Sequence, residues 1–148
     1  MANMPASTLN KNAKLWVAAL RSGKYNQGRG RLLSYVNEVP LFCPLGVGCD
    51  VFRIKTGGGI WKADRYSSVK DTFIDRAGKR HVGVLPDSVT VWLGLEKNNG
   101  GNIFLAIPEM NDNHGYSFSK IASFIESMPK GLFRMSIPKT FMRAVRRR

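Results

Sequence analysis

The chain lacks acidic residues at both of its ends. Residues 1–37 hold six Lys or Arg and no Asp or Glu, and residues 130–148 hold seven and again no acid. The middle holds ten bases and all ten acids, so the net charge of +13 belongs to the two ends. Charge kept for solubility would be mixed along the chain. Sorted positive charge favours an anionic partner instead, with nucleic acid as the leading class.

Long apolar runs and a signal sequence are also missing. No apolar run approaches the roughly 18–20 residues that cross a bilayer. Residues 1–10 are polar and small, without the apolar segment of a signal peptide. The 148 residues, 43% of them hydrophobic, are still enough to bury a core. We therefore expect one domain with no membrane partner, acting inside a cell.

Cysteine and histidine are scarce. Cys43 and Cys49 are six residues apart, which is wider than the usual spacing of zinc ligands, and neither His81 nor His114 adjoins them. Buried thiols are the simpler interpretation. Residues 111–114 offer oxygen and imidazole ligands, but a divalent cation needs more carboxylates, and Asn and Asp are ordinary turn formers. No metal or cofactor is expected.

The spacing of apolar residues predicts an α+β fold. We expect a single compact domain with three or four short helices packed on small antiparallel β-hairpins. The expected boundaries are a polar N-terminal arm over 1–10, the domain over 11–129 and a basic C-terminal tail over 130–148.

Capping residues and glycines place the individual elements. Helices are expected over 12–22, just after Pro44, from Pro86 to Gly94, and over 118–127. Gly46 and Gly48, in the apolar stretch after Pro44, are expected to permit tight packing against a neighbour. The remaining predictions are hairpins 52–55/60–63 and 72–75/80–84, a strand over 103–107 and a turn over 111–115.

Four segments, in this order, resemble a known group of proteins. They are Trp16-x-x-Ala19-Leu20-Arg21-Ser22-Gly23-x-Tyr25-x-Gln27, Cys43-x-Leu45-Gly46-Val47-x-Cys49-Asp50, Leu85-Pro86-x-x-Val89-x-x-Trp92-Leu93-Gly94-Leu95, and Asn111-Asp112-x-x-Gly115-x-Ser117-Phe118-x-x-Ile121-Ala122-x-x-Ile125-Glu126. The set resembles small bacteriophage and prophage proteins of unassigned function. The resemblance implies a phage setting, either the host cytoplasm of an infected bacterium or the virion, and it transfers no catalytic residue.

Nucleic-acid contact requires cations, aromatic neighbours and a flexible backbone. A Gly/Arg-rich stretch over 24–31 and the basic tail meet these requirements. We expect the two ends to converge on one face and to bind DNA or RNA, or else an acidic host or virion protein. The predicted binding residues are Lys24, Arg29, Arg31, Arg134, Lys139, Arg143, Arg146, Arg147 and Arg148, with Tyr25 available for stacking.

Two other function classes stay open. The first is a protein–protein module, either a virion component or an inhibitor of host machinery. The second is a cysteine-dependent hydrolase in which Cys43 and His81 form a dyad, with Asp50 or Asp112 orienting the ring. The apolar surroundings of Cys43 argue against that dyad, because burial keeps a thiol protonated. A helix-turn-helix beginning at Ser117 is not favoured either, because proline and glycine interrupt residues 129–131.

Overall fold

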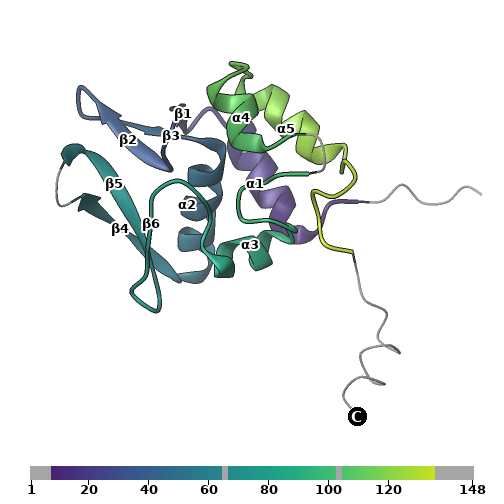
Figure 1. The fold of residues 1–148 in the computed structure, drawn as a ribbon, viewed down its shortest axis with the longest axis horizontal. Helices are drawn as coiled ribbons and strands as arrows, with labels where there is room; N and C mark the ends of the chain where they lie inside the picture. Colours follow the sequence, from purple (N-terminus) through teal and green to yellow (C-terminus); the bar gives the residue numbers. More distant parts are fainter. Residues whose placement is uncertain (1–7, 65–66, 103–104, 136–148) are drawn as a thin grey trace, which may run out of the picture.

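A mixed β-sheet and five helices make up the described part of the computed structural model, residues 8–64, 67–102 and 105–135 (Figure 1). The helices are α1 (Lys11–Arg21), α2 (Pro44–Thr56), α3 (Asp87–Leu93), α4 (Ile107–Asp112) and α5 (Phe118–Glu126). The strands are β1 (Asn26–Gln27), β2 (Leu33–Val36), β3 (Val39–Phe42), β4 (Gly59–Asp64), β5 (Ser67–Asp75) and β6 (Arg80–His81).

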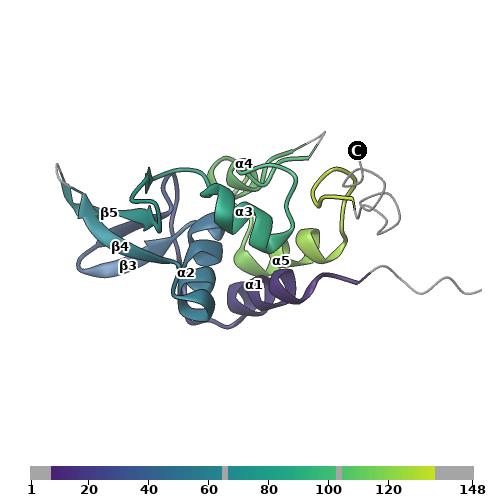
Figure 2. The same ribbon diagram turned by 90° about the horizontal axis from the view of Figure 1, so that it is seen from below.

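The sheet follows the order β1-β3-β2-β5-β4, and β6 pairs with β5 outside this path. All pairs are antiparallel except β1 with β3. The sheet lies on one side of the molecule, and α2 lies between it and the other helices (Figures 1 and 2). The single compact α+β domain predicted from the sequence is confirmed, with five helices in the described part where three or four were expected.

Helix α2 forms the centre of the fold because nearly every side of it is buried. Pro44 occupies its first turn, the Cys43 Sγ accepts a hydrogen bond from the Gly46 amide, and Gly57 ends it in the left-handed conformation. A Cβ on Gly46 would lie 1.8 Å from the Leu32 carbonyl oxygen, so only glycine permits this approach. The expected close packing of this segment is therefore confirmed.

One predicted strand is wrong, and the end of another falls on a helix. Residues 52–55 continue α2, and the hairpin partner of β4 is β5. Of the predicted strand over 103–107, residues 103 and 104 lie outside the described residues, Ala106 forms only an isolated bridge with Gly101, and residue 107 begins α4, which Pro108 helps to start. Short apolar runs cannot distinguish a buried helix from a strand by periodicity alone. The pairing of Phe73 with His81 confirms the second predicted hairpin at residues 80–81.

The core joins both halves of the chain. Trp16 of α1 is fully buried, and its indole Nε1 donates to the Pro44 carbonyl oxygen at 2.9 Å. Packing continues past residue 129, since Leu132 is fully buried and the Glu96 amide donates to its carbonyl oxygen at 2.9 Å. The first residues of the basic C-terminal segment are thus part of the domain.

Candidate nucleic-acid interface

The two ends of the described chain meet around Gly94. The side chain of Asn10 caps α1 through the Ala13 amide, and its Nδ2 donates to the Leu93 carbonyl oxygen at 2.9 Å. From the other end, the Arg134 amide donates to the Gly94 carbonyl oxygen at 2.8 Å. Gly94 has a φ of +77°, and a Cβ there would lie 2.7 Å from Asn10 Nδ2. Both described ends therefore leave the same side of the fold (Figures 1 and 2).

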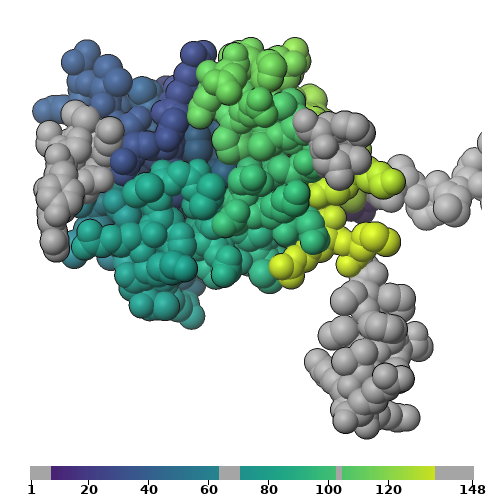
Figure 3. Space-filling model, viewed as in Figure 1, coloured from purple at the N-terminus to yellow at the C-terminus, as the bar shows by residue number. Residues whose placement is uncertain are grey.

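We define the terminal surface as Lys11, which follows Asn10 in the chain, together with Lys130 and Arg134; all three are exposed. Lys130 and Arg134 line an open pocket of about 680 Å³ whose wall also includes Phe133. Among the described residues of that wall, Glu96 is the only acid. Figure 3 shows the segment around this pocket, in yellow, forming one edge of the molecule. The predicted tail residues Lys139, Arg143, Arg146, Arg147 and Arg148 lie outside the described residues.

Two of the predicted binding residues, Arg31 and Tyr25, make contacts within the protein. Arg31 is half-buried, and its Nη2 donates to the Asp71 carbonyl oxygen at 3.4 Å. The Tyr25 hydroxyl donates to Asp50 Oδ2 at 2.6 Å, and its ring meets Phe42 edge to face. Burial, followed by the hydrogen bond to Asp50, raises the pKa of Tyr25 well above its usual value. Tyr25 therefore anchors the segment after α1 and is not an unengaged stacking ring.

Asp50 shows why this anchor forms. Its carboxylate is buried and accepts hydrogen bonds from Tyr25, from Arg53 Nε at 2.9 Å and from Trp61 Nε1 at 3.0 Å. A buried charge is tolerated when donors surround it in this way. The sequence raised Asp50 as an orienting group for His81, but the carboxylate instead joins α2 to the loop after α1 and to β4.

The Gly/Arg-rich loop is fixed by Asn111, which is 0% exposed. The Asn111 Nδ2 donates to the Gly28 carbonyl oxygen at 2.7 Å, and its Oδ1 accepts from Gln27 Nε2 at 2.6 Å. The Gly30 amide donates to Asp112 Oδ1 at 3.1 Å. These contacts, the Asn111 network, hold a loop that composition alone would describe as flexible. Asp112 is thereby engaged with the loop and does not orient His81.

Arg29 extends from this loop onto an exposed surface that the sequence did not reveal. Its Nη2 lies 3.6 Å from the position a Cβ on Gly115 would occupy. Beyond Gly115, Lys120 Nζ lies 3.8 Å from the centroid of the Tyr116 ring. The centroids of the His114 and Tyr116 rings are 5.6 Å apart, and the two ring planes are inclined by 39°. We call Arg29, His114, Tyr116 and Lys120 the loop surface. The four-residue spacing of Tyr116 and Lys120 was the only sequence signal for it.

Lys24 lies apart from both surfaces. It is exposed and lines a groove between α1 and α2, together with Lys55 and Ile54, of which Ile54 is 60% exposed. Of the predicted binding residues that the structure describes, only Arg134 stands on the terminal surface and only Arg29 on the loop surface. The structure thus distributes the basic N-terminal segment over several places.

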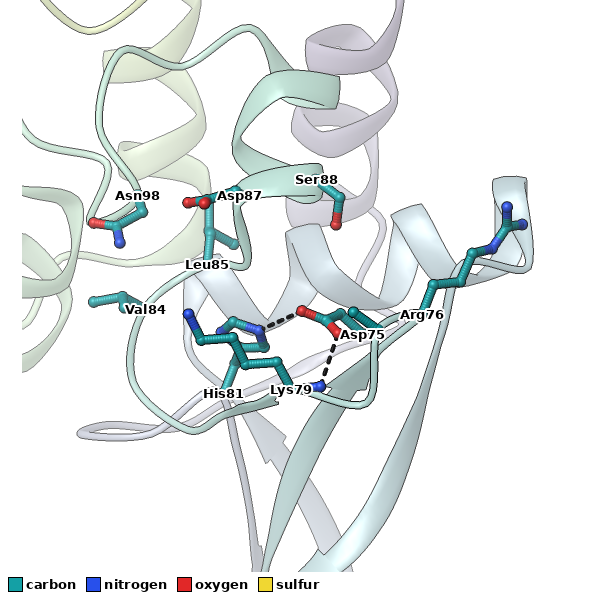
Figure 4. Close-up of a pocket in the computed structure, with 10 residues that line it drawn as sticks. Asp75, Arg76, Lys79, His81, Val84, Leu85, Asp87, Ser88 and Asn98 are labelled. Atoms are coloured by element: carbon teal, nitrogen blue, oxygen red, sulfur yellow. Dashed lines mark hydrogen bonds and ion pairs between the residues drawn. The ribbon is translucent and has the colours of Figure 1, made fainter.

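The geometry does not form the Cys43–His81 dyad. Cys43 is 4% exposed, and burial raises the pKa of its thiol to about 11. The His81 Nε2 pairs with Asp75 Oδ2 at 2.9 Å, in an open pocket of about 400 Å³ that Cys43 does not line (Figure 4). Both cysteines are unbridged and buried.

The pocket of Figure 4 holds an imidazole oriented by a carboxylate. The hydrogen bond from His81, followed by one from the Lys79 amide, lowers the pKa of Asp75. Asp87 and Ser88 lie across the pocket from this pair (Figure 4). Within the described residues, no hydroxyl or thiol is hydrogen-bonded to His81.

A metal centre and a membrane span are both missing from the described ranges. No cluster of three or more His, Cys, Asp or Glu residues suited to a metal ion occurs in 8–64, 67–102 and 105–135. In the same ranges, each helix falls short of the length and apolar character that a bilayer crossing requires.

The fold and these surfaces define a small α+β domain with exposed basic residues at several places in its described part. The chain belongs to a family of domains of unknown function, DUF8296, whose model matches residues 9–129. Neither the curated proteins nor the solved structures contain a match to it. The matched range ends at Pro129, so the basic C-terminal segment lies beyond the part that the family shares.

Proposed function

We propose that this protein binds nucleic acid, DNA or RNA, through the terminal surface together with the basic tail that follows it. The observation that carries the proposal is the meeting of both described ends at Gly94. Lys11 of the N-terminal segment thereby comes to the same end of the fold as Lys130 and Arg134 of the C-terminal segment. The phage setting, in the host cytoplasm or the virion, belongs to this proposal as well.

Electrostatics decides what such a surface binds. Lys130 and Arg134 are exposed, and Arg134 is attached to Gly94 through its backbone amide, which leaves its guanidinium on the surface. Adding the five bases of residues 136–148 supplies enough cations to neutralise several phosphates. Each neutralised phosphate releases counterions, so the affinity should fall steeply as salt rises.

The test is a salt titration of binding to a fluorescein-labelled oligonucleotide, both as DNA and as RNA. A log–log slope steeper than about −2 is expected. Replacing the five bases of residues 136–148 by Gln should make the slope shallower by about 0.7–0.9 for each phosphate that is no longer neutralised. No binding at low salt, or a slope shallower than about −2, would overturn the proposal.

A matched pair of variants assigns the surface. The double variant Lys130→Gln/Arg134→Gln removes two exposed cations from the terminal surface. The control, Lys62→Gln/Arg80→Gln, removes two exposed cations from the sheet. Only the first pair should weaken binding and reduce the slope. Equal effects of both pairs would show that net charge, and not this surface, governs affinity.

One observation favours a protein partner as the second candidate. The groove between α1 and α2 is lined by Leu15, Val51 and the exposed Ile54, with Lys24 and Lys55 beside them and no acid among the described residues that line it. An apolar groove with cationic neighbours suits an acidic amphipathic segment of another protein. Two results together would favour this candidate: the oligonucleotide titration shows no binding, and Ile54→Ser lowers the affinity for a synthetic acidic amphipathic peptide.

A further inference from the structure

The loop surface differs from the terminal surface in the kind of contact it offers. It combines two rings, His114 and Tyr116, with two cations, Arg29 and Lys120. These four side chains come from two segments more than eighty residues apart, which the fold brings together. Cations beside aromatic rings are the arrangement by which proteins hold unpaired nucleotides.

The rings are arranged so that one of them remains accessible. Lys120 Nζ stands over the Tyr116 ring at 3.8 Å from its centroid, and Tyr116 is half-buried against the core. His114 is exposed and lies against Tyr116 with its ring tilted by 39°. A nucleobase that stacks on His114 would therefore add a further ring to the existing stack of His114, Tyr116 and Lys120.

Arg29 is held in place before any ligand arrives. The Asn111 network fixes the Gly28 carbonyl and the Gly30 amide on either side of it. Because the backbone is ordered in advance, a phosphate contact from Arg29 loses less conformational entropy on binding than one from a flexible loop.

The local charge balance indicates that stacking, not charge alone, would supply affinity here. Glu109 is exposed on α4, and Asp112 lies beneath the loop, so Arg29 and Lys120 do not stand in a purely cationic field. Asp112 Oδ1 accepts two hydrogen bonds, one from the Gly30 amide and one from Asn111 Nδ2, and these contacts fix the loop. A surface of this composition gains little from a duplex, whose bases are already stacked on one another.

Building on the proposed nucleic-acid function, we infer that the loop surface binds unpaired bases and makes the protein prefer single-stranded nucleic acid. His114, supported by Tyr116, stacks on a base, while Arg29 and Lys120 contact the flanking phosphates. The terminal surface contributes attraction that is shared by single strands and duplexes. The preference for single strands comes from the loop surface.

The experiment compares dissociation constants for a labelled single-stranded oligonucleotide and a blunt duplex of the same length. His114→Ala should weaken single-strand binding by about 5- to 150-fold, the range expected when one base no longer stacks on a ring. Duplex binding should stay within about twofold of that of the unaltered protein, because its bases do not reach His114. His114→Phe keeps a ring at the position and should retain most of the single-strand affinity.

A second pair of variants tests the cation. Arg29→Gln should weaken single-strand binding and make its salt slope shallower by about 0.7. Arg80→Gln, which removes an exposed arginine from β6, should leave the preference for single strands unchanged. Melting temperatures of all variants should match that of the unaltered protein, since His114, Arg29 and Arg80 are exposed.

The two proposals fail in different ways. Absence of binding to either oligonucleotide at low salt overturns the proposed function and this inference with it. Salt-dependent binding with equal affinity for single strand and duplex, or an equal weakening of both in His114→Ala, overturns the inference and leaves the proposed function standing.

Discussion

The two basic segments are similar in sequence and differ in structure. Both lack acids, but the N-terminal bases are distributed among several elements, and two of them are tied to other parts of the chain. Arg21 pairs with Glu126, and Arg31 donates to the Asp71 carbonyl oxygen. In the C-terminal segment, Lys130 and Arg134 stand exposed beside one pocket. A count of charges along a sequence therefore does not give the charge of a surface.

The difference has a physical cause. The N-terminal segment runs from α1 to β2 past remote elements that supply partners for two of its bases. Glu126 and Ser123 of α5 contact Arg21, and Asp71 of β5 contacts Arg31. The C-terminal segment is attached through the buried Leu132 and through backbone hydrogen bonds of Leu132 and Arg134. Its charged side chains can remain in water while its backbone is fixed.

The largest effect should come from breaking the attachment of the C-terminal segment. Leu132→Ala removes a fully buried side chain and should lower the free energy of unfolding by about 2–5 kcal/mol. Lys130→Ala, two residues earlier and exposed, should change it by less than about 0.5 kcal/mol. Urea unfolding measures both. Equal, small effects would mean that the segment is not part of the cooperative domain.

A second substitution tests how the N-terminal segment is held. Asn111→Ala leaves the buried Gly28 carbonyl without its donor and removes one of the two acceptors of Gln27 Nε2, which keeps the Tyr116 carbonyl oxygen, and it should cost about 1–3 kcal/mol of stability. It should also weaken single-strand binding, because Arg29 loses its fixed backbone. Asn113→Ala, at an exposed position two residues on, is the control. An unchanged unfolding midpoint in Asn111→Ala would contradict the role given to this network.

Local signals were sufficient to predict much of the helical part. Asn10 and Ser117 cap α1 and α5 through the amides three residues later, and Gly94 ends α3 where the sequence predicted its end. These features depend on neighbours within one turn. No comparable signal marks the β2–β3 hairpin, because its turn uses Asn37 and Glu38 at positive φ in place of the usual Asn-Gly pair.

The candidate site was less predictable because its contacts are remote in sequence. Composition pointed to Arg29, but the ring and cation beside it, His114 and Lys120, come from the other half of the chain. The Tyr25 hydroxyl is hydrogen-bonded to Asp50, a residue that the sequence suggested as the group orienting His81 in a catalytic dyad. Whether a charged side chain is exposed or paired is decided by tertiary contacts, which spacing along the chain does not encode.

A hydrogen-bonded pair outside both basic segments, Asp75 and His81, provides a reference for the smaller effects. Asp75 and His81 have side chains only 17% and 11% exposed, and the hydrogen bond from His81 lowers the pKa of Asp75. A carboxyl whose folded-state pKa is depressed stabilises the fold above its unfolded-state pKa, and this contribution is lost as pH falls through the folded-state value. His81→Gln should therefore flatten the loss of stability on acidification.

Unfolding midpoints in urea, measured from about pH 7 down to about pH 2, check this expectation, because the contribution is lost between the usual aspartate pKa of about 3.9 and the lower folded-state value. Asp87→Asn, an exposed acid lining the same pocket, serves as the control and should leave the acid limb of the profile as it is in the unaltered protein. An identical acid limb in His81→Gln would show that the pair does not couple folding to pH.

The smallest effect is expected for the Arg21–Glu126 pair, which joins α1 to α5. The two side chains are 39% and 43% exposed, and Arg21 Nη2 also donates to Ser123 Oγ at 2.8 Å. A double-mutant cycle with Arg21→Met and Glu126→Gln should give a coupling below about 1 kcal/mol, and it should shrink at high salt. A cycle of Lys62→Met with Glu126→Gln should give none. Because so weak a pair can be displaced, a phosphate could compete with Glu126 for Arg21. A coupling well above about 1 kcal/mol that persists in high salt would instead show that Glu126 holds Arg21 in place. Arg21 would then differ even more from the exposed bases of the C-terminal segment.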